Sequence, residues 1–183
     1  MKIKQYIFIF LTTLFISSLY ANNLQKNTSA IINEAYQTAQ QTAWFQQGSD
    51  ANTIHLIYVV ADPNDSACRS LVSILQPYIQ KGFLRVNWIP ANFIQPAIPD
   101  KTKTLQQFKT FAKAMNINEE HFVSNTASGG TQSVQDVLDG LKKLEKNIRL
   151  PVIFVKTIEG KVELIQGLPN ADQLKLVTQS SAE

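Results

Sequence analysis

One apolar segment constrains the fold more than any other part of the sequence. Residues 54–61 read IHLIYVVA, in which His55 is the only polar residue. A run of this length, rich in β-branched side chains, is typical of a strand that is buried on both faces of a sheet. Pro63 breaks the strand, and Asp65 is well placed to cap a helix that begins at Ser66. The sequence therefore predicts a central strand that leads directly into a helix.

A second strand follows that helix. The helix is expected from about residue 66 to residue 81, with an interior kink at Pro77 and an end at Gly82. Residues 83–90 then alternate between two faces, as in a strand. Together the three elements predict a β-α-β unit with parallel strands and a right-handed crossover.

The rest of the chain supplies elements on both sides of this unit. Before it we expect a polar, flexible leader over residues 22–29 and a helix over 30–47 that Ser29 caps. After it, a helical insert of about 91–150 is expected to hold helices near 101–115, 119–123 and 133–148, with a break at Ser128-Gly129-Gly130. A hairpin with strands near 152–155 and 162–165 and a last helix that Asn170 caps complete the order.

The first residues are typical of an export signal. Lys2 and Lys4 precede an apolar run from Tyr6 to Leu19, which is short for a bilayer-spanning helix, and Ala21 is a plausible cleavage point. An uncleaved membrane anchor is the alternative. We thus expect a signal peptide over 1–21, a leader and linker helix over 22–48 and one domain over 49–183.

The charge balance argues against a nucleic-acid partner. Removal of residues 1–21 leaves 15 Lys and Arg against 14 Asp and Glu, a net charge of +1, with no dense basic patch.

The number of cysteines limits the chemistry of the chain. Cys68 is the only cysteine, and His55 and His121 lie far apart without a cluster of carboxylates beside them. These counts exclude a disulfide framework within the chain and argue against a metal centre, so we expect no metal and no cofactor. Ser66 and His55 lack a third partner for a catalytic triad. In an oxidising compartment a lone thiol is either buried and inert or retained for chemistry.

The order of these elements and motifs resembles the thioredoxin fold, and within it the exported DsbC/DsbG branch of disulfide isomerases. The resemblance covers roughly residues 43–177. Its motifs are Trp44-Phe45-Gln46-Gln47-Gly48, the strand and pair Tyr58-Val59-Val60-Ala61-Asp62-Pro63, the basic Arg69, Ser128-Gly129-Gly130, Pro151-Val152-Ile153-Phe154-Val155, Gly160-Lys161-Val162 and Gly167-Leu168-Pro169. It implies an α/β, thioredoxin-like fold with a helical insertion and an N-terminal linker helix, and a cis peptide bond before Pro151.

Three departures from the family decide the expected function. Asp65 stands where the family has its nucleophilic cysteine, so the motif is Asp-Ser-Ala-Cys and only Cys68 is kept. Leu150 stands where the family has a threonine before the cis-proline. About 20 residues precede the linker helix where the family has a dimerisation domain, so no family-type dimer is expected.

The chemistry of Asp65 leads to the same expectation. Thiol–disulfide exchange needs an accessible thiolate and a second thiol that resolves the mixed disulfide. A carboxylate three residues before Cys68, on the same helix face, disfavours the thiolate. The simplest interpretation makes Asp65 a helix cap and Cys68 a small buried side chain.

We therefore expect a periplasmic protein that has lost dithiol catalysis. It would act by binding, as a chaperone-like or envelope-assembly component, with protein or peptide clients and no stable membrane span after processing. The expected contact groove beside Asp65 and Cys68 is formed by Asp62, Pro63, Ser66, Ala67, Arg69, Leu150 and Pro151. Two alternatives stay open: a monothiol oxidoreductase that uses Cys68 with an external resolving thiol, and a Cys68-linked homodimer.

Overall fold

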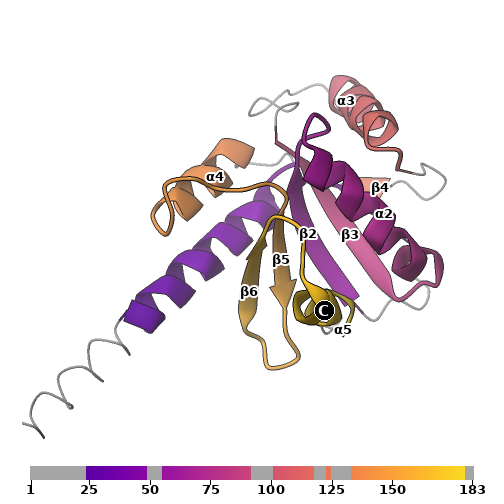
Figure 1. Cartoon of the computed structure of the whole chain (residues 1–183). Coiled ribbons are helices and arrows are strands. Elements are labelled where there is room, and N and C mark those ends of the chain that lie inside the picture. Colours follow the sequence, from indigo (N-terminus) through magenta and orange to yellow (C-terminus); the bar gives the residue numbers. More distant parts are fainter. Residues whose placement is uncertain (1–23, 49–54, 92–100, 118–122, 125–132, 180–183) are drawn as a thin grey trace, which may run out of the picture.

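A single mixed sheet organises the chain. The computed structural model describes residues 24–48, 55–91, 101–117, 123–124 and 133–179. Its six strands lie in the order β4-β1-β3-β2-β5-β6 (Figure 1). The strands are β1 (Phe45–Gln47), β2 (His55–Ala61), β3 (Leu84–Pro90), β4 (Val123–Ser124), β5 (Val152–Lys156) and β6 (Val162–Gln166).

The predicted β-α-β unit forms the centre of this sheet. β2 and β3 are parallel and in register from the pair His55–Leu84 to the pair Ala61–Pro90. The helix α2 (Ser66–Gln80) connects them and contains Pro77. β5 runs antiparallel to β2, and β6 runs antiparallel to β5.

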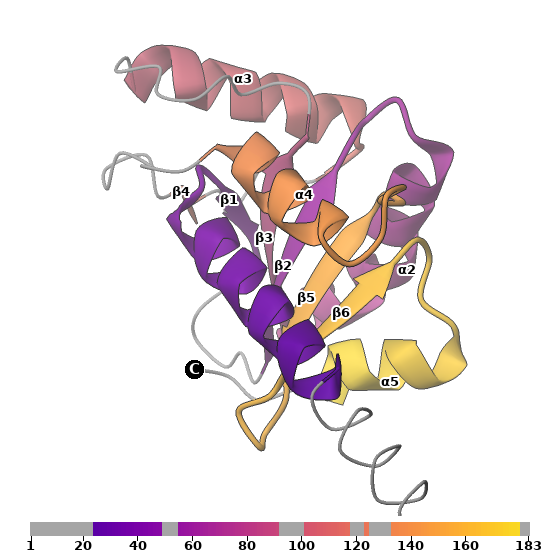
Figure 2. The same ribbon diagram turned by 90° about the vertical axis from the view of Figure 1, so that its left-hand side faces the viewer.

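Helices cover both faces of the sheet. On one face lie α2, α3 (Lys101–Ala114) and α5 (Ala171–Gln179); on the other lie the N-terminal helix (residues 24–41) and α4 (Val134–Lys142) (Figures 1 and 2). This is the thioredoxin-like α/β fold that the sequence predicted, with an N-terminal helix and helices inserted between β3 and β5. Each face holds a separate buried cluster, so the core has two layers.

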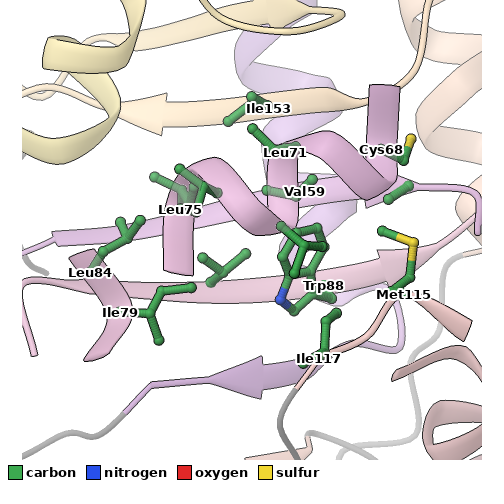
Figure 3. Close-up of a cluster of buried hydrophobic side chains, with 14 of the residues drawn as sticks. Val59, Cys68, Leu71, Leu75, Ile79, Leu84, Trp88, Met115, Ile117 and Ile153 are labelled. Atoms are coloured by element: carbon green, nitrogen blue, oxygen red, sulfur yellow. The ribbon is translucent and has the colours of Figure 1, made fainter. Parts of the chain in front are cut away.

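The apolar stripe of α2 holds the helix against the sheet. Leu71, Leu75 and Ile79 are buried in the same cluster as Val59 and Trp88 (Figure 3). Side chains at i, i+4 and i+8 share one helix face, and they meet the face of the sheet that alternate strand residues form. This packing fixes the start of α2 against the end of β2.

The predicted start of the domain was wrong in two respects. The helix includes residues 24–29, which were expected to be a flexible leader, so Ser29 lies inside it and does not cap it. Residues 45–47 are not helical but form β1, antiparallel to β3 with Phe45 opposite Trp88. Phe45 is fully buried, and Gln47 accepts a hydrogen bond from the Trp88 indole at 3.0 Å. Long-range burial of this kind overrides the local helical pattern.

The inserted helices agree only in part with the prediction. α3 confirms the helix expected near 101–115, whereas α4 ends at Lys142 instead of continuing to residue 148. α4 begins with a capping box in which Ser133 and Asp136 bond each other's backbone amide. Val123 belongs to the short strand β4 and not to a helix.

Several expectations lie outside the described residues. They are the signal peptide over 1–21, most of the helix expected at 119–123 and the break at Ser128-Gly129-Gly130. Within the ranges that are described, no helix has both the length and the apolar character needed to cross a membrane.

Gly48 provides a test of the junction after β1. Its φ is +105°, and a Cβ added there would lie 2.8 Å from the Leu84 carbonyl oxygen. We expect Gly48→Ala to lower the free energy of unfolding by roughly 2–3 kcal/mol, measured by urea titration.

Gly160→Ala is the matched control, because Gly160 also has a positive φ, +79°, but no atom lies within 4 Å of the added Cβ. The free energy of unfolding of this control should fall by about 1 kcal/mol. Equal losses in the two variants would contradict the proposed clash at Gly48.

Candidate functional site

The junction between β2 and α2 is a tight turn built from two aspartates. The Asp65 amide donates to the Asp62 carbonyl at 3.1 Å. The Asp62 carboxylate accepts from the backbone amide of Asn64 at 2.9 Å and from its side-chain amide at 3.1 Å. These bonds hold the chain in one conformation as it leaves the sheet, so the next residues reach the helix in a fixed orientation.

Asp65 is the N-cap of α2, as the sequence predicted. Its carboxylate accepts from the amides of Ala67 at 2.7 Å and Cys68 at 3.1 Å. Those amides have no partner within the helix, and they form the positive end of its dipole. The carboxylate therefore occupies the position at which an anion is best stabilised.

Cys68 lies one turn into α2 and is completely buried. Its relative exposure is 0%, and the Asp62 amide donates to Sγ at 3.5 Å. Burial is the largest effect on this thiol and raises its pKa to about 11; the Asp62 amide lowers the pKa, and the negative charges of Asp65 and Asp62 raise it. Cys68 belongs to the buried cluster that includes Leu71 and Met115 (Figure 3). The prediction of a buried thiol is confirmed.

Pro151 completes the site from the neighbouring strand. The peptide bond between Leu150 and Pro151 is cis, as the resemblance implied. Val60 pairs with Val152, so the antiparallel register brings Pro151 opposite Ala61, next to Asp62. Five of the predicted site residues therefore gather at one end of the sheet: Asp62, Asp65, Cys68, Leu150 and Pro151.

The other predicted groove residues differ in exposure. Pro63 is buried, Ala67 is half-buried, and Ser66 and Arg69 are exposed. The Arg69 guanidinium donates to the Pro63 carbonyl, so this side chain reinforces the turn in addition to facing solvent.

Sequence reasoning missed Leu168 as a residue of this site. The Gly167 amide donates to the Pro151 carbonyl at 2.8 Å, which holds the segment after β6 beside the proline. Leu168 follows directly and is 44% exposed, an unusual exposure for a large apolar side chain. The sequence marked residues 167–169 as the end of a strand and as a motif of the family resemblance, but not as part of the site. The missing signal was the antiparallel pairing of β6 with β5.

His55 and Ser66 cannot act together. His55 begins β2 and Ser66 lies beyond its other end, so a strand of seven residues, about 20 Å, separates them. His55 is only 8% exposed, and burial lowers its pKa. It is a buried residue at a strand end, as the sequence predicted.

The arrangement can bind a ligand, but its thiol is poorly suited to nucleophilic attack. The only cysteine is shielded from solvent and from anions by burial and by Asp65. In the part of the chain that the structure describes, no group of three His, Cys, Asp or Glu side chains could hold a metal ion. The apolar residues near the turn with its two carboxylates are Leu150, Pro151 and Leu168, of which Leu168 is the most exposed.

Comparison with known proteins gives two similar sequences. No protein-family model matches the chain. The thiol:disulfide interchange protein DsbG of Pseudomonas aeruginosa is 26% identical over 147 residues, which are 77% of this chain and 57% of that protein. DsbG of Escherichia coli K12 is 24% identical over 155 residues, 79% of this chain and 60% of that protein. The chain thus spans less than two thirds of the length of either relative.

Solved structures give looser matches. A periplasmic thioredoxin-like protein from Salmonella enterica serovar Typhimurium is 14% identical, with a TM-score of 0.42 over 80% of this chain and 94% of that one. A linker-deletion variant of Proteus mirabilis ScsC is also 14% identical, with a TM-score of 0.44 over 92% of this chain and 91% of that one.

The state of Cys68 can be measured by alkylation. A rise in pKa from 9.0 to about 11 lowers the thiolate fraction about 100-fold at a pH of about 8 or below. We expect labelling of the native protein by iodoacetamide at pH 8 to be at least about 100-fold slower than labelling of the denatured chain. Labelling that stays fast below pH 7 would mean an accessible, stabilised thiolate and would contradict this description.

Proposed function

We propose that this chain, which is similar in sequence to the thiol:disulfide interchange protein DsbG, is an exported, periplasmic protein of that type that binds polypeptide clients without dithiol catalysis. The clients are unfolded or secreted proteins, or components of an envelope assembly. The contact surface is the groove beside Asp65, Cys68 and Pro151.

One observation carries the proposal. The Asp65 carboxylate accepts hydrogen bonds from the first free amides of α2, where the family has its attacking thiol. A dithiol mechanism needs a thiolate at this place and a second thiol one turn further on. Cys68 alone supplies the second position, and it is buried. The chemistry that remains at the junction is hydrogen bonding and apolar contact.

The proposed contact surface includes apolar side chains. Leu168 is exposed and Leu150 is half-buried, and both are close in the chain to the hydrogen bond between Gly167 and the buried Pro151. Exposed apolar side chains grouped beside polar ones are typical of a binding surface. Unfolded clients expose the apolar segments that such a surface can cover.

The monothiol alternative has less support. It requires Cys68 to attack a disulfide, yet the thiol is fully buried and its pKa is raised to about 11. Both effects lower the population of an accessible thiolate at neutral pH. A disulfide between two copies through Cys68 meets the same obstacle of access.

Client binding predicts an effect at Leu168. Leu168→Asp should weaken the suppression of aggregation of a reduced, unfolded model protein, because it places a charge on the apolar contact surface. We expect the protein concentration needed for half-suppression to rise about tenfold, measured by light scattering.

Phe83→Asp is the matched control for this experiment. Phe83 is 46% exposed, close to the 44% of Leu168, but it lies before β3, at the other end of the sheet from the groove. The control should suppress aggregation like the wild type. Absence of any suppression by the wild-type protein would contradict the proposed binding function.

The loss of dithiol chemistry can be tested by restoring the missing thiol. Asp65→Cys creates a Cys-x-x-Cys sequence at the start of α2, where the helix dipole favours a thiolate. We expect this variant to form a disulfide with Cys68 and to catalyse insulin reduction at least tenfold faster than the wild type. The readout is turbidity of the precipitating insulin chain.

Asp65→Ser is the control, because serine keeps a helix cap and adds no thiol. It should remain at the wild-type rate. Rapid reduction of insulin by the wild-type protein would contradict the proposal directly.

A further inference from the structure

The outer edge of β6 has no strand beside it. β6 is the last strand of the sheet and pairs with β5 along one edge; no other strand of the described ranges pairs with it (Figure 1). Such an edge presents backbone amides and carbonyls that can pair with another strand. Natural proteins commonly protect it with lysines, which repel a second copy of the same edge.

The charges at the start of β6 would instead attract a second copy of the same edge, because they have opposite signs. Lys161 and Glu163 lie two residues apart, on the same side of the strand, and their charged groups are 2.5 Å apart. When two such strands pair antiparallel about Val162, each Lys161 stands opposite Glu163 of the second copy. Opposite charges in directly facing positions stabilise a strand pair. The two pairs between the copies and the one pair within each strand form a ring of four alternating charges.

A partly apolar groove lies at the same place. It has a volume of about 390 Å³ and lies between the start of β6 and the N-terminal helix, with Leu24, Thr28 and Ile32 on the helix side and Val162 on the strand side. Leu24 is 69% exposed, and Ile158, in the turn before β6, is 77% exposed. These are the two most exposed large apolar side chains among the described residues. Exposed apolar surface beside an open strand edge marks an interaction site.

We propose that the outer edge of β6 is a homodimer interface, in which two copies pair antiparallel about Val162. A two-fold axis through Val162 makes the contact isologous, so each groove faces the same groove of the second copy. Leu24 and Ile32 of each N-terminal helix then pack near the axis and cover the apolar surface. The charge complementarity between Lys161 and Glu163 selects a second copy of this chain as the occupant.

The dimer is independent of the proposed client binding. Pro151 stands at the start of β5 and the turn with Ile158 follows its end, so the candidate groove and the dimer edge lie at opposite ends of that strand. The candidate site at Pro151 therefore stays open in both copies of the dimer, and the interface requires no separate dimerisation domain.

Charge reversal tests this interface sharply. The native protein is expected to be a dimer by sedimentation equilibrium over a series of concentrations. Lys161→Glu or Glu163→Lys alone places like charges opposite each other twice, and each should weaken dimerisation at least tenfold. The double variant, Lys161→Glu with Glu163→Lys, restores the alternating ring with its signs exchanged and should recover the wild-type dissociation constant.

Matched controls lie on α5. Lys175 pairs with Asp172 at 3.6 Å on the exposed surface of this helix, outside the β6 edge. Lys175→Glu and Asp172→Lys change the net charge by the same amounts as the two single variants, and both should leave the dimer intact.

Three outcomes would overturn the proposal. They are a wild-type protein that is monomeric at all concentrations, single variants that dimerise like the wild type, and a double variant that does not recover. Urea unfolding of each variant checks that loss of the dimer is not loss of the fold.

Discussion

The parallel pairing of β2 with β3 is the constraint on which the rest of the structure depends. Seven consecutive residue pairs join the two strands, and the crossover through α2 then has little freedom. The apolar stripe of α2 must lie on the sheet, so its first turn must meet the end of β2. The turn between Asp62 and Asp65 closes the short distance that remains. The position of the candidate site is therefore a consequence of the central pairing.

Within that frame, one side chain decides the chemistry of the junction. A helix start attracts negative charge, whether the charge comes from a carboxylate, a thiolate or a bound anion. In this chain the charge is built in as Asp65, two covalent bonds from its own backbone, and it already satisfies two amides. The helix N-terminus, which can activate a thiol, is here occupied by a carboxylate that stabilises the helix. Burial of Cys68 agrees with that assignment, because a thiol without a partner for exchange packs well as a small apolar group.

The sequence predicted best what depends on local patterns. β2, α2 and β3 could be placed because an apolar run, a capping aspartate and an alternating strand each carry their own signal. β1 and β4 could not: they are three and two residues long, and their polar residues Gln46 and Ser124 give no alternation. The helix expected over 30–47 included Phe45, whereas its pairing with Trp88 and its contacts with Phe108 and Phe111, far along the chain, place it in the sheet.

For the candidate site, the same division holds. Asp65, Cys68 and Pro151 were found because motif order places them at element boundaries, and Leu168 was missed because its place depends on how β6 returns along β5. Which of these side chains is accessible also depends on packing that no local pattern encodes, as the contrast between exposed Arg69 and buried Pro63 shows.

The hydrogen bonds around Gln47 have a consequence for alternative topologies. Its side-chain amide accepts from the Trp88 indole and donates to Gln76 of α2, so one residue links β1, β3 and α2. A slip of β1 by one residue would turn Phe45 outward, bring Gln46 to this position and leave the indole without a partner. Gln47 therefore favours one alignment of β1, β3 and α2, because a shift to a neighbouring alignment would break its hydrogen bonds. Because the N-terminal helix ends only a few residues before β1, the same alignment sets the direction in which that helix leaves the domain.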